Sequence, residues 1–306
     1  LNYYDPRTDD LDYMFMISSS GDTIKENYCT FHQEGNNLYL KAGKEIFVLD
    51  VSTKRILHSY PIDFSKLHDL ALLRTDDHQY ITGVGAKGYM VYKIEPANSV
   101  SLIDSGSING TSILNHHDGL CWIGDAEGKI HYYDAKTSKI FYSKQVSNAL
   151  VNSISYLSDT KLLISGRSNQ LYVFDIHTRS IIDSIVFSST PFNTPVKLLL
   201  TPFVDRDSTL WVGSDGQGVL FHNFSKTKFK HFLGSTNGNK STSIIKLFQQ
   251  GDKSLITLNR KGGILWISES GHKLYQWNTL PSGISDFTAN TGVQLNERQI
   301  LFASYG

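Results

Sequence analysis

The sequence predicts an all-β fold, a seven-bladed β-propeller closed by strands from both termini and formed as one domain over residues 1–306. Three observations predict it. A strand motif recurs every 41 to 48 residues, the two ends of the chain hold complementary parts of one repeat, and no segment has the periodicity of a three-turn amphipathic helix. Units of about 40–50 residues with four strands each are typical of propeller blades.

The repeat consists of a strand with a bulky residue and a small one, a loop, and an aromatic strand that ends in Asp. Its two clearest copies begin with Cys121-Trp122-Ile123-Gly124 and with Leu210-Trp211-Val212-Gly213. The equivalent positions in the seven units are Tyr39, Tyr80, Trp122, Leu163, Trp211, Ile256 and Leu301. We expect Trp122 and Trp211 to be buried between neighbouring blades, because large aromatic side chains fill such spaces.

Each unit is expected to contain four strands, here called A to D in chain order. In the unit around Trp122 we expect strand A near 111–115, strand B at 119–124, strand C at 128–134 and strand D at 139–146. Strand C alternates between two faces, as a half-buried strand does.

The turn from strand C to strand D repeats the pattern Asp-x-x-Thr. Copies start at Asp50, Asp134 and Asp175. An Asp side chain in this position accepts hydrogen bonds from backbone N–H groups two residues on. The pattern therefore predicts a capped turn at the same place in several blades.

The two ends of the chain predict one shared blade. The segment Tyr3-Tyr4-Asp5-Pro6-Arg7-Thr8 matches residues 132–137, so residues 1–17 are expected to be strands C and D without A and B. Residues 285–306 supply the missing strands, with 299–306 as strand B. This pairing covers strand edges that would otherwise be exposed. Because the sequence starts within a repeat, we expect it to be a fragment of a larger sensor protein.

Composition excludes several classes of partner. Lys plus Arg and Asp plus Glu each number 29, so the formal net charge is zero. A neutral chain lacks the basic footprint of a nucleic-acid-binding protein, and no apolar run is long enough to span a membrane. We therefore expect no nucleic acid and no membrane contact by this segment. Cys29 and Cys121 are expected two blades apart, too far to form a disulfide.

Motifs that suggest cofactor or metal chemistry have a simpler interpretation. Gly83-Val84-Gly85-Ala86-Lys87-Gly88 fits the dinucleotide fingerprint, but a strand follows it instead of the required helix, so a hairpin is predicted. His116-His117-Asp118 lies in a predicted turn without further ligands and is interpreted as solvated. We expect no cofactor, no metal and no catalytic residue. An acid–base pair of loop carboxylates stays open as an alternative.

The segment Asp207-Ser208-Thr209-Leu210-Trp211-Val212-Gly213-Ser214, with Gly218-Val219-Leu220, resembles the repeat of the two-component-regulator propellers. That repeat runs D-x-x-G-x-L-W-[IV]-G-T-x-x-G-L-x-x-Y-D, and residues 121–124 and 1–6 fit it as well. Ser208 replaces the usual Gly. The tail, residues 277–302, is similar to the last blade before a β-sandwich in that family. The resemblance thus implies the second of two propellers.

The resemblance implies a function. These propellers form the periplasmic sensor region of hybrid two-component systems of gut Bacteroidetes, followed by a β-sandwich, a membrane span and a histidine kinase. The chain is accordingly expected to be a non-catalytic, periplasmic ligand-binding domain that responds to oligosaccharides from polysaccharide breakdown. Its expected partners are the neighbouring propeller and the β-sandwich, with a homodimer left open. The alternatives are a WD-repeat-like interaction scaffold and a propeller lyase or hydrolase.

The ligand surface is expected where the B–C and D–A loops share one face, if strand A is innermost. Polar loop residues there combine acceptors, donors and one aromatic ring, which suits polyhydroxyl ligands. The alternative is that they are ordinary hairpin tips. The predicted ligand-binding residues are Asp125, Glu127, Arg167, Asn169, Asp215, Gln217, Asn259, Arg260 and Tyr305.

Overall fold

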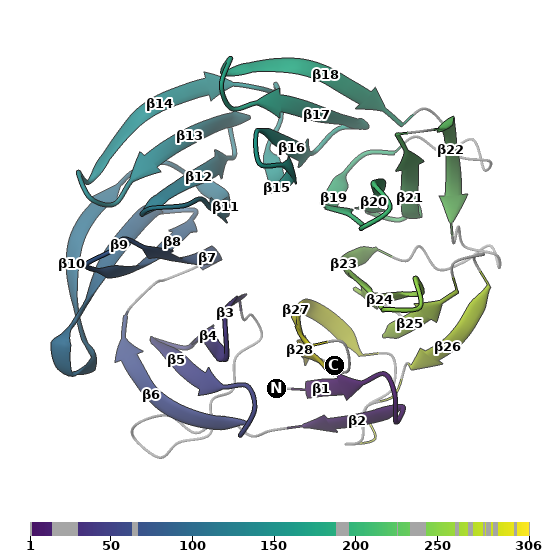
Figure 1. Ribbon diagram of the computed structural model, residues 1–306, viewed down its shortest axis with the longest axis horizontal. Coiled ribbons are helices and arrows are strands. Elements are labelled where there is room, and N and C mark those ends of the chain that lie inside the picture. The colour runs from purple at the N-terminus through teal and green to yellow at the C-terminus, as the bar shows by residue number, and fades with distance from the viewer. Residues whose placement is uncertain are drawn as a thin grey trace. The chain divides into compact units, whose positions relative to one another are not determined.

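The computed structural model describes residues 2–13, 30–62, 67–187, 196–224, 226–232, 243–260, 263–268, 272–277, 279, 283, 287–296 and 299–305. These residues form seven four-stranded antiparallel sheets, the blades of the predicted all-β propeller (Figure 1). The one helical element among them is a 3₁₀ turn at Pro96–Asn98. By compactness the chain divides into unit 2, Phe15–Ile154, and unit 1, Leu1–Met14 with Ser155–Gly306.

Unit 2 contains three complete blades, each a meander in which strand B pairs with A and C, and C with D. Their strands are β3 (Thr30–Glu34), β4 (Asn37–Ala42), β5 (Glu45–Asp50), β6 (Arg55–Pro61), β7 (Leu67–Arg74), β8 (Gln79–Gly85), β9 (Gly88–Glu95), β10 (Ser99–Gly106), β11 (Gly110–Asn115), β12 (Leu120–Asp125), β13 (Lys129–Asp134) and β14 (Lys139–Gln145). The four strands of the unit around Trp122 agree with the predicted bounds to within one residue at each end.

Unit 1 contains the other blades, and β15 crosses the boundary between the units. Their strands are β15 (Val151–Ser158), β16 (Lys161–Gly166), β17 (Gln170–Asp175), β18 (Ser180–Val186), β19 (Leu199–Val204), β20 (Thr209–Ser214), β21 (Gly218–Asn223), β22 (Lys226–Phe232), β23 (Ile244–Gln249), β24 (Leu255–Asn259), β25 (Ile264–Ile267), β26 (Lys273–Trp277), β27 (Thr288–Asn296), β28 (Gln299–Tyr305), β1 (Asn2–Asp5) and β2 (Asp10–Tyr13). All seven predicted repeat positions lie in the second strand of a blade.

The blade shared by the two termini is confirmed. Its strand order is β2-β1-β28-β27, and β1 pairs antiparallel with β28 so that Tyr4 faces Ile300 (Figure 1). The Tyr4 side chain is fully buried in a cluster that includes Ile300 and Phe302. Its ring centroid lies 4.6 Å from that of Trp277. The N-terminal strand is thus held by its core side chain as well as by its backbone.

Within each unit, hydrophobic cores fill the spaces between successive blades. In unit 2, Leu73 and Val84 of one blade pack with Cys121 and Ile123 of the next. Burial raises the pKa of the Cys121 thiol, which is fully shielded from solvent. Cys29 lies outside the described residues. The alternating strand residues therefore build the core that the period-2 pattern predicts.

Trp122 and Trp211 are both buried, as predicted, with 1% and 7% of their surfaces exposed. The Trp122 ring stacks on Tyr132 of the adjacent strand, with centroids 4.3 Å apart. Trp211 packs with Ile244 and Leu247, which belong to the following blade. The predicted packing between blades is confirmed for Trp211 by these contacts.

The Asp-x-x-Thr turns are capped as predicted. The backbone N of Thr53 donates to Asp50 Oδ1 at 2.7 Å, and Thr178 N donates to Asp175 Oδ1 at the same distance. The pKa of the Asp50 carboxyl is lowered chiefly by the hydrogen bond from the Ser52 hydroxyl and next by that from Thr53 N, and the pKa of Asp175 is lowered chiefly by the bond from Thr178 N. The residue after each Thr adopts a left-handed backbone conformation, with φ 58° at Lys54. This non-glycine left-handed residue is part of the turn and was not predicted.

The glycine-rich segment 83–88 is a hairpin between β8 and β9, as its context predicted. Gly88 has φ +129°, and a Cβ there would lie 1.9 Å from the carbonyl oxygen of Gly106. Glycine is therefore required by close backbone approach, without a nucleotide.

Candidate functional site

The predicted ligand residues lie at the B–C ends of five blades. Antiparallel pairing places the end of strand B beside the start of strand A, so both loops of a blade lie at the same end. The backbone N of Asp215 donates to Leu198 O at 3.1 Å, and Arg260 N donates to Ser243 O at 2.8 Å. The Ser243 hydroxyl also donates to the Asp215 carboxylate. Ser243 therefore links Asp215 and Arg260 within unit 1.

Two predicted residues are buried in the hairpins that they stabilise. Asn259, 1% exposed, donates from Nδ2 to Gly263 O at 3.0 Å. Asp125, 3% exposed, accepts at Oδ1 from the backbone N of Glu127 at 3.0 Å and of Lys129 at 2.7 Å. Both side chains fix the geometry of their own loops.

Asp125 also belongs to a longer hydrogen-bonded chain. Its Oδ2 lies 2.9 Å from His131 Nε2, and His131 Nδ1 lies 2.8 Å from Ser143 Oγ. We call these three side chains the Asp125 network. They have the order of groups found in a nucleophilic triad, which additionally needs a substrate cleft and oxyanion donors. Neither cavity described below is lined by them. The network connects β12, β13 and β14.

The remaining predicted residues are more accessible. Glu127, Arg167, Asp215 and Arg260 are exposed. Asn169 and Gln217 are half-buried, and Asn169 Nδ2 donates to Phe187 O at 3.4 Å. The backbone of Tyr305 pairs with Thr288 in the shared blade, while its side chain lies outside the described residues.

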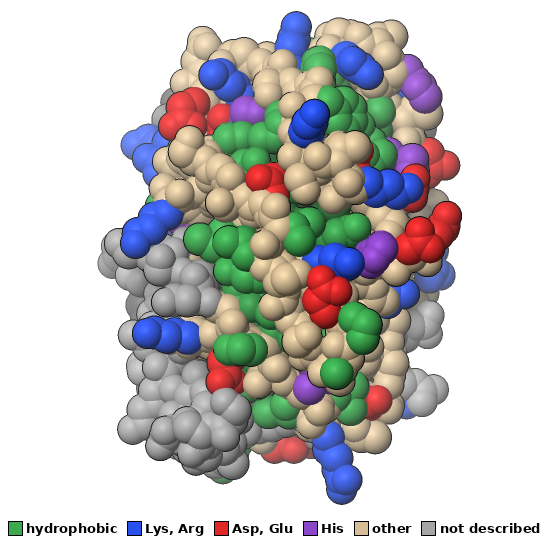
Figure 2. All heavy atoms as spheres, turned by 90° about the vertical axis from the view of Figure 1, so that its left-hand side faces the viewer, with side chains coloured by type: hydrophobic (Ala, Val, Ile, Leu, Met, Phe, Trp, Pro, Cys, Tyr) green, Lys and Arg blue, Asp and Glu red, His purple; other side chains and the backbone are tan. Residues whose placement is uncertain are grey.

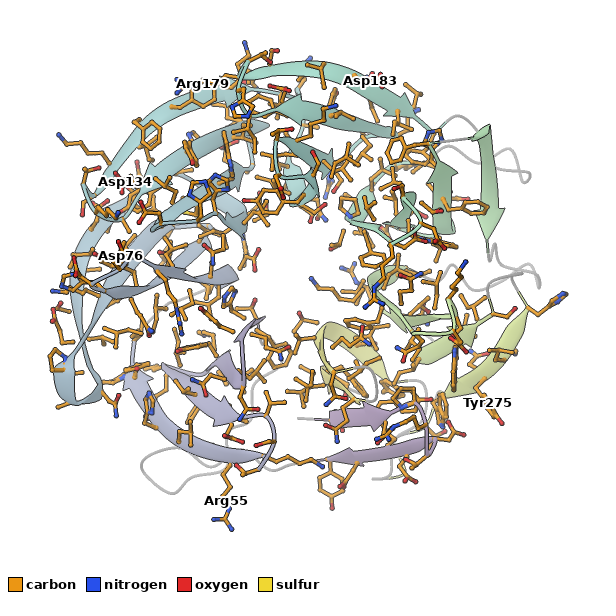
Figure 3. All side chains as sticks on the ribbon, viewed as in Figure 1. Arg55, Asp76, Asp134, Arg179, Asp183 and Tyr275 are labelled. Atoms are coloured by element: carbon orange, nitrogen blue, oxygen red, sulfur yellow. The ribbon has the colours of Figure 1, made fainter. Side chains whose placement is uncertain are left out.

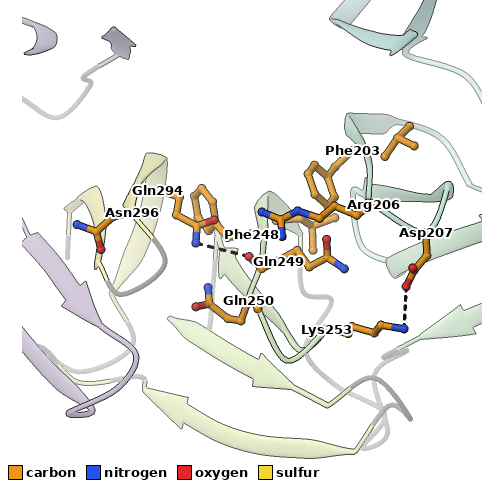
Figure 4. A pocket seen from close by; sticks show the side chains of 12 residues that line it. Phe203, Arg206, Asp207, Phe248, Gln249, Gln250, Lys253, Gln294 and Asn296 are labelled. Carbon is orange, nitrogen blue, oxygen red and sulfur yellow. Dashed lines mark hydrogen bonds and ion pairs between the residues drawn. The ribbon is translucent and has the colours of Figure 1, made fainter. Parts of the chain in front are cut away.

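A cavity of about 760 Å³ lies in unit 1 at the opposite end of the strands (Figure 4). We call it the unit 1 cavity. It is bounded by the β19–β20 and β23–β24 hairpins and by the end of β27. Its lining residues are Phe203, Val204, Arg206, Asp207, Leu247, Phe248, Gln249, Gln250, Gly251, Lys253, Gln294 and Asn296.

The lining of the unit 1 cavity is amphipathic. Phe203 and Leu247 extend the apolar cluster around Trp211, and Phe248 is 8% exposed. Four amide side chains and three charged groups face the same space. Lys253 Nζ pairs with Asp207 Oδ2 at 3.0 Å, and Gln294 Nε2 donates to the Gln249 carbonyl at 3.5 Å. An apolar floor with a few polar groups is typical of small-ligand sites.

A second cavity, of about 590 Å³, lies in unit 2 between the β7–β8 hairpin and the β9–β10 turn. Its basic residues have acidic partners nearby. Arg74 Nε lies 2.5 Å from Glu34 Oε1, and Lys93 Nζ lies 3.5 Å from Glu95 Oε2. This internal pairing makes it the weaker candidate of the two.

Charges are mixed on the face shown in Figure 2, where Lys and Arg side chains alternate with Asp and Glu. In the described part of the chain, no three His, Cys, Asp or Glu side chains gather as metal ligands. The same residues contain no helix that is long and apolar enough to cross a membrane.

No family model and no curated protein matches the chain. Solved structures with a similar fold include the computationally designed Ika8 protein, at TM-score 0.62 and 12% identity over 89% of this chain and 79% of that one. They also include the extracellular domain of a hybrid two-component system from B. thetaiotaomicron, at TM-score 0.64 and 17% identity. That match covers 88% of this chain and 38% of the other, so the chain spans about two fifths of the extracellular domain.

Proposed function

We propose that this chain is a ligand-binding propeller from the periplasmic sensor region of a hybrid two-component system, and that it responds to oligosaccharides released from polysaccharides. The observation that carries the proposal is the agreement of two independent lines. The repeat around Trp211 resembles that of two-component-regulator propellers, and the fold is similar to the extracellular domain of such a system. Fold alone does not give function, so the repeat motif adds the specific support.

The proposal includes partners in the same protein. The solved extracellular domain is longer than this chain, which supports further modules beside the propeller. We infer that these are a second propeller and a β-sandwich, and that a histidine kinase receives the signal. The domain itself is proposed to be non-catalytic, because its Ser–His–Asp arrangement is engaged in connecting three strands.

An interaction scaffold is the second candidate, and exposed apolar side chains favour it. Leu57, Leu102, Phe141 and Tyr275 each expose about half of their surface on the outermost strands of their blades. Figure 3 shows Tyr275 projecting away from β26. Such side chains suit a protein partner or a second copy of the chain.

The test is a thermal-shift screen of the 306-residue protein against plant and host oligosaccharides, followed by calorimetry on the hits. A ligand that binds only the native state at 100 times its Kd stabilises it by about 2.7 kcal/mol. We expect a concentration-dependent rise in Tm with at least one saccharide. If none shifts the Tm while light scattering reveals self-association, the scaffold function is favoured instead.

A further inference from the structure

The unit 1 cavity contains a buried donor without a partner. Gln250 is 8% exposed, and its Nε2 has no hydrogen-bond partner among the described residues. Its backbone is fully engaged, because its N donates to Ser254 O at 2.9 Å and its O accepts from Lys253 N at 3.0 Å. The turn therefore does not need the amide. A buried polar group that is left unpaired carries a free-energy penalty, and no hydrogen bond holds Nε2 in this orientation.

The amide can present that donor to the cavity. Gln250 lines the cavity beside Gln249 and Gln294 (Figure 4). The terminal torsion of a Gln side chain is broad and roughly two-fold, so a half-turn exchanges the positions of Nε2 and Oε1. Such a half-turn brings Nε2 to the position that Oε1 occupies, without movement of the backbone.

The cavity also has one uncompensated positive charge. Lys253 and Asp207 neutralise each other at 3.0 Å. The exposed guanidinium of Arg206 has no acidic partner within the described parts of the chain. Figure 4 shows its side chain reaching from the β19–β20 hairpin toward the β23–β24 hairpin. A guanidinium fork matches the geometry of a carboxylate better than that of any neutral group.

The aromatic side chains that line the unit 1 cavity narrow the class of ligand that fits it. Phe203 and Phe248 offer ring surface between the polar groups. A saccharide ring has an apolar C–H face and polar hydroxyl edges, which match this alternation of aromatic and amide groups. A volume of about 760 Å³ lies within the range of small-molecule sites. A nucleic acid would require several unpaired cations.

We propose that the unit 1 cavity binds an acidic saccharide, a uronate unit of an oligosaccharide. Arg206 holds the carboxylate, Gln250 hydrogen-bonds a ring or hydroxyl oxygen, and Phe203 and Phe248 contact the apolar face of the sugar. The inference rests on the proposed saccharide-sensing function and assigns its site and ligand class. It places the site at the A–B end of the strands, opposite the residues that the sequence predicted.

The experiment is calorimetry on the 306-residue protein with trimers of galacturonate, glucuronate and mannuronate, each compared with its methyl ester. The ester removes the charge and keeps the rest of the sugar. We expect at least one acid to bind and its ester to bind about 10-fold more weakly or worse, because charge-assisted hydrogen bonds are the stronger ones. In Arg206→Ala the acid should lose about 10- to 100-fold in affinity, and the ester should be unchanged.

A second variant separates binding from folding. Gln250→Met removes the unpaired donor and keeps the side-chain length, so the Tm of the free protein should stay the same or rise while acid and ester both bind several-fold more weakly. A purely structural Gln would give a lower Tm. Arg55→Ala is the matched control, because Arg55 is an exposed arginine that projects outward from β6 in unit 2 (Figure 3). Its affinity for the acid should equal that of the wild type.

The outcomes distinguish the two proposals. Neutral oligosaccharides that bind with affinity unaffected by Arg206→Ala and Gln250→Met would overturn the site and support the sensing function. An acid whose binding is insensitive to both substitutions would likewise overturn the site. Absence of binding by every acidic and neutral saccharide would overturn both the site and the function.

Discussion

The Asp125 network and the unit 1 cavity use similar polar side chains at opposite ends of their blades. In the network, the Asp125 carboxylate accepts hydrogen bonds from two backbone amides and pairs with His131, and the side chains of Asp125 and His131 are buried. In the cavity, Gln250 has a buried donor without a partner. Polar groups that bond one another fix the fold. Polar groups left open in a concave wall are available to a ligand.

The largest expected effects come from the two tryptophans, because one lies beside each region. Trp122→Ala and Trp211→Ala should each lower the free energy of unfolding by about 3–5 kcal/mol through the cavity that remains. Trp211→Ala should also weaken saccharide binding, since Trp211 packs behind Phe203 and Leu247, which line the cavity. Urea unfolding and calorimetry measure the two quantities. Equal loss of binding in both variants would show that stability alone controls affinity.

Asp125→Ala tests whether the network is structural. It leaves two backbone N–H groups and His131 without their shared acceptor, so we expect a loss of about 3 kcal/mol in unfolding free energy. Saccharide affinity should be unchanged. Glu127→Ala is the control, because this neighbouring carboxylate is exposed and its removal should change stability by less than about 0.5 kcal/mol. If Asp125→Ala is as stable as the wild type but no longer binds the saccharide, the saccharide site lies at the B–C end of the blades.

The repeats could be predicted from sequence because the period, the Asp-x-x-Thr turns and the matching ends are local patterns. The register of Tyr4 with Ile300 follows from aligning the first residues with those after Trp122. The left-handed residue after each turn, such as Lys54, carries no such signal, because Lys, Ser and Arg occupy it and none is a glycine.

The candidate site could not be predicted in the same way. The sequence indicates only the side-chain type of a loop residue, and Asp125 and Asn259 have types that suit a saccharide ligand. Their burial depends on which backbone amides point at them, which the sequence does not encode as a motif. Gln250 and Arg206 come from A–B loops that share no repeat pattern. Only the three-dimensional packing of successive blades brings them to one cavity.

Burial of a titratable side chain makes the stability of the fold depend on pH, and His32 is the side chain that tests this. Desolvation lowers the pKa of His32 in β3 to about 4. The unfolded chain takes up this proton near pH 6.5, and the folded protein resists it until about pH 4. The stabilisation is therefore complete above pH 6.5 and is lost as the pH falls toward 4. Between pH 7 and pH 5 we expect His32 to account for about 2 kcal/mol of lost stability. Urea unfolding of the wild type and of His32→Gln at both pH values measures how much unfolding free energy each protein loses between pH 7 and pH 5. The difference between the two losses is the contribution of His32, and equal losses would contradict the prediction.

The ion pair at the rim of the unit 1 cavity should contribute little to stability, unlike the Asp125 network. Asp207 and Lys253 are each about half exposed, so Asp207→Asn should change the unfolding free energy by less than about 1 kcal/mol. The same substitution removes a negative charge near the proposed carboxylate position. Affinity for an acidic saccharide should therefore rise about two- to five-fold at low salt, because the repulsion between Asp207 and the carboxylate of the ligand is lost.

The gain should decline as ionic strength increases, because exposed charges are screened over about 10 Å at 0.1 M salt. The methyl ester should show no gain at any salt concentration. Removing a carboxylate thus lowers stability in the Asp125 network and raises ligand affinity in the unit 1 cavity. Calorimetry at two salt concentrations is the measurement. An unchanged or lower affinity for the acid in Asp207→Asn would mean that the carboxylate of the ligand does not lie at this rim, and that Arg206 serves another contact.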